Sequence, residues 1–104
     1  MVHTARSDAE INAIIANFPG LVVVDAFATW CGPCKALAPK LELMQQAHPN
    51  IRIVKIDVEE VSSFADNHDI SAMPTLLFFK NGAEVDRVTG ANEPLINKTI
   101  LKHI

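Results

Sequence analysis

The spacing of apolar positions changes several times along the chain, and this pattern predicts strands and helices in turn. Residues 21–28 form a nearly unbroken apolar run, which is typical of a strand buried on both faces of a sheet. Leu37, Leu41 and Met44 recur at helical spacing, as expected for one buried helix face. The predicted strands are 2–4 (a weak one), 21–28, 51–57, 75–80 and 83–89, and the predicted helices are 7–18, 32–47, 59–68 and a last one that opens at 92–94.

Local signals support several of these elements. Ser7 and Glu10 have the spacing of a capping box at the start of the first helix. Asn81 followed by Gly82 favours a two-residue hairpin, so the strands on either side are expected to be antiparallel. The apolar stripe of the last helix predicts four inward-facing residues, namely Leu95, Ile96, Thr99 and Ile100.

The order of the elements predicts an α/β fold. The strand–helix–strand unit at 21–57 requires two parallel strands joined by a right-handed crossover, whereas the hairpin adds an antiparallel pair. We therefore expect a mixed five-stranded sheet with four helices on its two faces. No repeat or linker interrupts the chain, so residues 1–104 are expected to form a single domain.

Composition narrows the classes of function. Hydrophobic residues make up 49% of the chain and charged residues 20%, which is enough for a core and excludes intrinsic disorder. The net charge is −3, and no cluster of Lys or Arg is present, which excludes nucleic acid and anionic membranes as expected partners. The N-terminal stretch lacks the apolar core of a signal peptide, and we expect a cytoplasmic monomer.

The two cysteines, Cys31 and Cys34, lie where the buried strand ends and the second helix begins. The start of a helix favours the thiolate of Cys31, and Cys34 is three residues further on, on the same helical face. Pro33 is tolerated in a first helical turn and stiffens the ring between the cysteines. Because helical neighbours are further apart than the cysteines of a relaxed disulfide, this pair is predicted to form a labile, reactive disulfide.

Two other interpretations of the cysteines are a buried, inert pair and half of a zinc site. A zinc site is disfavoured because no second Cys-x-x-Cys is present and because His48 and His68 are much more widely spaced than zinc-ligand pairs. All four histidines (His3, His48, His68 and His103) are expected at the surface.

The ordered set of motifs resembles the thioredoxin family over essentially the whole chain. The residues that carry the resemblance are Val24-Asp25, Ala28 to Lys35 (with Trp30-Cys31-Gly32-Pro33-Cys34 at the centre), Ala38-Pro39, Lys55 to Val58, Ala72 to Thr75, Phe79 to Gly82 and Gly90 to Asn92.

The resemblance implies a protein disulfide reductase. Cys31 attacks the target disulfide, and Cys34, expected to be the more buried, resolves the mixed disulfide. The family needs no bound cofactor besides the redox-active Cys31–Cys34 disulfide. A thioredoxin reductase, an NADPH-linked flavoenzyme, is expected to restore the dithiol. The expected targets are disulfide-containing proteins such as peroxiredoxins, ribonucleotide reductase and methionine sulfoxide reductases.

Asp25 is the most informative residue after the cysteines. A carboxylate inside a strand buried on both faces is desolvated, so its pKa is expected to be raised. We expect Asp25 to take the proton from Cys34 during resolution. Lys55, on the neighbouring predicted strand, either shares a hydrogen bond or a water with Asp25 or is a solvated lysine.

A second set of residues is expected to bind the target. Base rates favour a trans bond between Met73 and Pro74, whereas the resemblance implies a cis bond facing the cysteines, with the Met73 backbone free to pair with a target strand. Trp30 is expected to be partly exposed, and Gly90 is either part of this surface or a simple turn glycine. The expected target surface comprises Trp30, Gly32, Pro33, Met73, Pro74, Gly90 and Ala91.

The chain departs from the family pattern at Ala26, where Phe is usual. We expect the lost volume to be filled, for example by a water that changes the setting of Asp25. Two rival functions remain: an oxidase or isomerase of the same fold, and a binding module whose cysteines are incidental. Gly32-Pro33 between the cysteines favours the reducing class.

Overall fold

Strands and helices alternate through the first half of the chain, and a hairpin and a helix complete the second half. The computed structural model describes all 104 residues. In chain order the elements are β1 (His3–Thr4), α1 (Asp8–Asn17), β2 (Val22–Phe27), α2 (Gly32–Ala47), β3 (Arg52–Asp57), α3 (Ser62–Asn67), β4 (Thr75–Lys80), β5 (Ala83–Thr89) and α4 (Glu93–His103).

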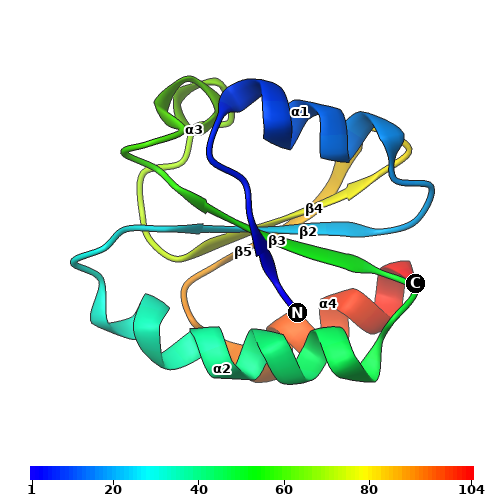
Figure 1. Ribbon diagram of the computed structural model, residues 1–104. Coiled ribbons are helices and arrows are strands. Elements are labelled where there is room, and N and C mark those ends of the chain that lie inside the picture. Colours follow the sequence, from blue (N-terminus) through cyan, green and yellow to red (C-terminus); the bar gives the residue numbers. More distant parts are fainter.

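The five strands form one mixed sheet in the order β1-β3-β2-β4-β5. β3 pairs in parallel with both β1 and β2, while β4 is antiparallel to β2 and to β5. The strand that leads to the cysteines, β2, is therefore the centre of the sheet (Figure 1). The predicted α/β fold with a mixed five-stranded sheet and four helices is confirmed.

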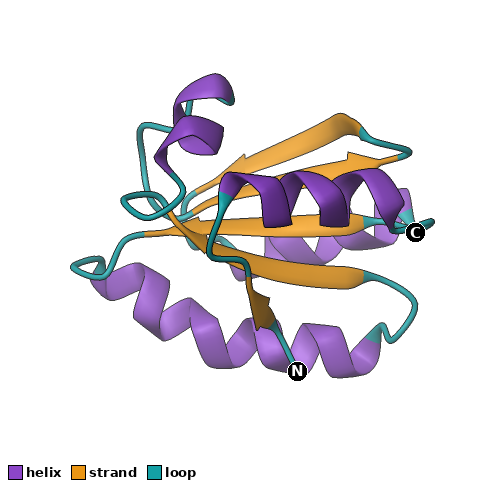
Figure 2. Ribbon diagram, turned by 45° about the horizontal axis from the view of Figure 1, so that its top comes forward, coloured by secondary structure: helices purple, strands orange, loops and turns teal.

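The helices cover both faces of the sheet, with α1 and α3 on one side and α2 and α4 on the other (Figures 1 and 2). Alternate residues of β2 enter two different apolar clusters. Val22 and Val24 pack in the cluster of α1 and α3, whereas Val23 packs in the cluster of α2 and α4. Because successive strand residues point to opposite faces, Asp25 lies on the α2 side.

Two of the local signals act as predicted. The Ser7 hydroxyl accepts a hydrogen bond from the N–H of Glu10 at the start of α1. Asn81 and Gly82 both have positive φ, 54° and 81°, which is the conformation that a tight hairpin between twisted strands requires. Gly82 adopts this conformation without the steric penalty that a side chain brings.

The helix predicted at 59–68 is shorter in the structure. Asp57 accepts the backbone N–H groups of Glu59 and Glu60, which form a turn, and α3 begins only at Ser62. Its first turn is capped from another helix, because the Asp8 side chain in α1 accepts the Phe64 N–H at 2.6 Å. A cap supplied from 56 residues away leaves no local sequence signal.

Two predictions of burial were wrong. Leu95 is 43% exposed, whereas Ile96, Thr99 and Ile100 are buried as expected. Leu95 lies in the first turn of α4, where its backbone N–H is capped by Asn92 and the side chain projects off the buried stripe. Three of the four histidines predicted at the surface, His48, His68 and His103, are half-buried, and the His68 ring stacks on Phe64 with centroids 4.0 Å apart. No helix is long and apolar enough to cross a membrane.

Candidate functional site

Cys31 and Cys34 form a disulfide at the start of α2, with their Cα atoms 5.3 Å apart. Cys31 is the N-cap of this helix, and its sulfur accepts the backbone N–H of Cys34 at 3.2 Å. The helix start therefore presents a donor to the Cys31 sulfur, which favours the thiolate once the disulfide opens. Both residues are 4% exposed, so the greater burial expected for Cys34 is absent in this disulfide form.

An exposed rim surrounds the buried disulfide. Trp30 is 68% exposed, as predicted, and Gly32 and Pro33 are also exposed. Behind the rim, the cysteines form a small cluster with Ala28. The disulfide is thus accessible only at one edge of the protein, where a partner can approach.

The Met73–Pro74 bond is cis, as the resemblance implies and against the base-rate expectation of trans. The Met73 carbonyl oxygen lies 3.6 Å from the sulfur of Cys31. The Met73 N–H forms no hydrogen bond within the protein, so it is free for a partner strand. Gly90, with φ of 97°, donates its backbone N–H to the Pro74 carbonyl at 2.8 Å, which brings it to the same edge.

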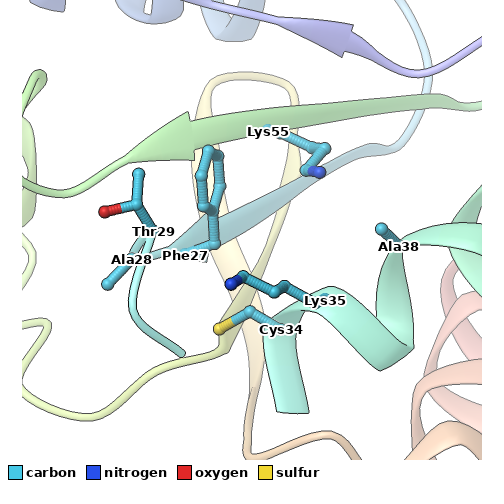
Figure 3. Close-up of a pocket in the computed structure, with 7 residues that line it drawn as sticks. All are labelled: Phe27, Ala28, Thr29, Cys34, Lys35, Ala38 and Lys55. Atoms are coloured by element: carbon cyan, nitrogen blue, oxygen red, sulfur yellow. The ribbon is translucent and has the colours of Figure 1, made fainter. Parts of the chain in front are cut away.

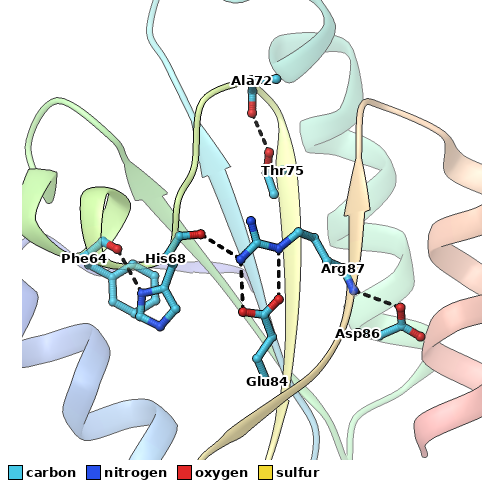
Figure 4. A network of polar contacts seen from close by, with 7 residues as sticks. All are labelled: Phe64, His68, Ala72, Thr75, Glu84, Asp86 and Arg87. Atoms are coloured by element: carbon cyan, nitrogen blue, oxygen red, sulfur yellow. Dashed lines mark hydrogen bonds and ion pairs between the residues drawn. The ribbon is translucent and has the colours of Figure 1, made fainter.

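The segment that carries Met73 and Pro74 is held at both ends by polar side chains (Figure 4). Arg87 on β5 donates to the carbonyl of His68 at 2.7 Å and pairs with Glu84 through two hydrogen bonds. At the other end, the Thr75 hydroxyl donates to the carbonyl of Ala72. Sequence reasoning missed these contacts, because a strand arginine carries no signal of which distant carbonyl it reaches.

Asp25 is fully buried, and neither carboxylate oxygen has a hydrogen-bond partner. Burial raises its pKa from 3.8 to about 7, and the positive charge of Lys55 partly offsets this increase. The expectation of a buried carboxyl with a raised pKa agrees with this environment. A group that titrates near neutral pH can both accept and return a proton.

Lys55 occupies the position beside Asp25 on β3 but does not pair with it. Its ammonium group lies over the Phe27 ring, 4.8 Å from the centroid. A cation over an aromatic face is attracted by the ring quadrupole. Of the two alternatives for Lys55, a direct hydrogen bond to Asp25 is absent, and the side chain acts on Asp25 through its charge.

Ala26 and Asp25 lie on opposite faces of β2. Its side chain belongs to the cluster on the α1 and α3 face, together with Phe64 and Phe79, whereas Asp25 lies on the opposite face. The volume lost at Ala26 therefore lies on the opposite face of β2 from Asp25, because adjacent strand residues do not share a face, and a water that changes the setting of Asp25 stays a prediction.

A pocket of about 440 Å³ opens on the Cys34 side of the disulfide (Figure 3). Its lining comprises Phe27, Ala28, Thr29, Cys34, Lys35, Ala38 and Lys55. Five of these, Phe27, Ala28, Thr29, Lys35 and Ala38, were not among the predicted site residues. The pocket forms between the end of β2, the first turns of α2 and β3, so only the fold brings its walls together.

No three His, Cys, Asp or Glu residues are grouped so that they can hold a metal ion.

Comparison with known proteins gives a consistent result. The thioredoxin family model matches residues 2–102. "Thioredoxin-2" of Saccharomyces cerevisiae is 44% identical over 104 residues, which is the full length of both chains. The X-ray structure of Fasciola hepatica thioredoxin superposes with a TM-score of 0.93 at 39% identity, covering 99% of this chain and 100% of that one.

A further similar structure comes from a study of a yeast peroxiredoxin. It addresses the thiol-resolving mechanism of a yeast mitochondrial 1-Cys peroxiredoxin via glutathione/thioredoxin systems. The matching chain has a TM-score of 0.91 at 34% identity, with 97% of this chain and 94% of that chain covered.

Proposed function

Because this chain belongs to the thioredoxin family, we propose that the residues around its Cys31–Cys34 disulfide carry the family reaction in the roles given below. The protein is a dithiol–disulfide oxidoreductase with protein disulfide reductase activity. The observation that carries the assignment of roles is the position of Cys31, at a helix start and 3.6 Å from the Met73 carbonyl.

In the first step of the proposed reaction, the Cys31 thiolate attacks one sulfur of a target disulfide. A bond forms between Cys31 and that sulfur, and the second target sulfur leaves as a thiolate. The target contacts four exposed residues, namely Trp30, Gly32, Pro33 and Ala91. Its backbone accepts a hydrogen bond from the free Met73 N–H. Pro74 and Gly90 hold the Met73 backbone in place.

In the second step, Asp25 accepts the proton of Cys34, whose thiolate attacks the sulfur of Cys31. The Cys31–Cys34 disulfide forms, and the first target sulfur leaves as a thiolate and is protonated. Two electrons pass from the dithiol to the target. The raised pKa of Asp25, about 7, supports this role, because the ordinary carboxylate is too weak a base. Lys55 assists by keeping part of the Asp25 population ionised.

We further propose that a thioredoxin reductase, an NADPH-linked flavoenzyme, restores the dithiol. The proposed targets are peroxiredoxins, ribonucleotide reductase and methionine sulfoxide reductases. The peroxiredoxin study that contains a similar chain supports the first of these. We also propose that residues 1–104 act as a single monomeric domain in the cytoplasm and need no bound cofactor.

Trapping of the mixed disulfide tests the roles of the two cysteines. Cys34→Ser is expected to accumulate a covalent complex with a disulfide-containing target, because Cys31 attacks and no thiol resolves the product. Cys31→Ser is the matched control and should trap nothing. Equal trapping by both variants, or trapping by Cys31→Ser alone, contradicts the assignment.

A further inference from the structure

The pocket on the Cys34 side has the size and lining of a small-molecule site. Its volume of about 440 Å³ falls in the range of ligand pockets. Phe27, Ala28 and Ala38 supply apolar walls, and Cys34 closes one end (Figure 3). Such a site, with apolar walls and few polar groups, binds ligands that carry both an apolar body and one polar head.

Every polar side chain in the lining can donate a hydrogen bond, and two are cations. These are the Lys35 and Lys55 ammonium groups and the Thr29 hydroxyl. No carboxylate lines the pocket. The polar head that fits such a lining is an anion.

Both lysines of the pocket lack a carboxylate partner. Lys40, Lys102, Arg6 and Arg87 each form an ion pair with a glutamate or aspartate, whereas Lys35 and Lys55 form none. One unpaired surface lysine is ordinary, but two that converge on one apolar pocket leave a local positive charge in a protein of net charge −3. The Phe27 ring holds the Lys55 ammonium at the pocket wall.

We propose that this pocket binds a small amphipathic carboxylate, with its apolar body against Phe27 and Ala38 and its carboxylate between Lys35 and Lys55. A simple inorganic anion is a poorer candidate for the ligand, because it leaves the apolar walls of the pocket exposed to water. An acidic side chain of a target protein is a poorer candidate, because Cys31, Met73 and Gly90, at the target-binding edge, do not line the pocket.

Occupation of the pocket is expected to slow the resolving step. Lys55 stands beside Asp25 in the sheet, and its charge favours the ionised carboxyl. A bound carboxylate offsets that charge, so a smaller fraction of Asp25 is ready to accept the Cys34 proton. This effect on rate rests on the proposed role of Asp25, whereas binding itself does not.

Titration of the disulfide form with three probes tests the binding. The probes are 4-phenylbutanoate, the neutral 4-phenylbutan-1-ol and acetate, followed by amide chemical shifts. We expect saturable binding of 4-phenylbutanoate with shifts at Phe27, Lys35 and Lys55, and affinities about fivefold or more lower for the alcohol and acetate. Equal affinity for the alcohol, shifts elsewhere, or no saturable binding overturns the proposal.

Lysine variants test which charges hold the carboxylate. Lys35→Gln and Lys55→Gln are each expected to weaken 4-phenylbutanoate by about two- to fivefold. Lys98→Gln is the matched control, since Lys98 is an exposed lysine of α4 that also lacks a carboxylate partner. Equal affinities of all three variants overturn the proposal. The proposal is also overturned when no probe binds and Lys35→Gln and Lys55→Gln raise KM for acidic targets. That result assigns the two lysines to target recognition.

A kinetic measurement separates this inference from the role of Asp25. In the wild type, single-turnover resolution of the mixed disulfide at neutral pH should slow as 4-phenylbutanoate fills the pocket. Asp25→Asn should still bind the probe, but its rate of resolution should not fall further when the probe is bound. Binding without an effect on the wild-type rate contradicts the coupling through Asp25. Loss of binding contradicts the pocket and leaves the role of Asp25 standing.

Discussion

Asp25 and Lys55 share a register position on neighbouring parallel strands, yet their charged groups do not pair. The Lys55 ammonium lies over the Phe27 ring, and both Asp25 oxygens are left without a hydrogen-bond partner. Burial without hydrogen-bond partners disfavours the ionised carboxyl, which raises its pKa to about 7. The proposed role of Asp25 as proton acceptor for Cys34 rests on this raised pKa.

Stability should fall as the pH rises from about 4 to about 7. The unfolded chain releases the Asp25 proton near its ordinary pKa of 3.8, and the folded chain releases it near 7, so the folded state holds more protons between these values. The free energy of unfolding should be lower at pH 8 than at pH 4 by at most of the order of 4 kcal/mol.

Urea unfolding of the disulfide form at several pH values measures this effect. Asp25→Asn is expected to remove most of the decrease and to be more stable than the wild type at pH 8. A variant that loses stability over this range as steeply as the wild type contradicts the raised pKa.

Asp25→Asn should slow resolution of the mixed disulfide and leave the first attack nearly unchanged. A general base contributes typically about 100-fold or more to a rate, and the amide cannot accept the Cys34 proton. Rapid-mixing measurements with a target disulfide separate the two steps between pH 6 and 8. Unchanged turnover across this range excludes Asp25 from the proton transfer.

Arg87→Gln should weaken target binding and lower stability by about 1–3 kcal/mol, because the His68 carbonyl loses a charged donor. The segment from His68 to Met73 then loses one of its anchors, and KM for protein targets should rise more than kcat falls. Glu84→Gln is the matched control, since it leaves the Arg87 contact to His68 in place. Equal KM values for Arg87→Gln and Glu84→Gln contradict a positioning role.

Trp30→Ala should raise KM for protein targets with little change in stability. The side chain is 68% exposed, and surface substitutions usually change the free energy of unfolding by less than about 0.5 kcal/mol. Trp30→Phe keeps an aromatic surface and should retain most of the affinity. Thermal unfolding and steady-state kinetics check both statements, and a large loss of stability in Trp30→Ala assigns Trp30 to the core instead.

Much of the fold could be predicted from sequence because its signals are local. The apolar run that becomes β2, the Ser7 cap and the Asn81–Gly82 hairpin each depend on a few adjacent residues. The start of α3 could not be predicted, because its cap comes from Asp8 in another helix. Leu95 was misplaced because periodicity does not show that the first turn of a helix projects past the core.

Some features of the candidate site could likewise be predicted from the sequence, and others could not. The cysteines and the buried carboxyl follow from motif and strand pattern, whereas the position of the Lys55 ammonium depends on the Phe27 ring. Opposite faces of β2 also separate Ala26 from Asp25, although they are adjacent in sequence. The pocket between β2, α2 and β3 exists only once these elements pack.

The reduction potential of the Cys31–Cys34 couple is the most direct test of reductase function. Trp30, the only tryptophan and adjacent to Cys31, reports the redox state by fluorescence in graded thiol/disulfide buffers. We predict a single two-electron transition at a potential more negative than that of the cytosolic glutathione pool. A potential as high as that of the secretory-pathway oxidants, or no two-electron transition, contradicts a protein that donates electrons to target disulfides.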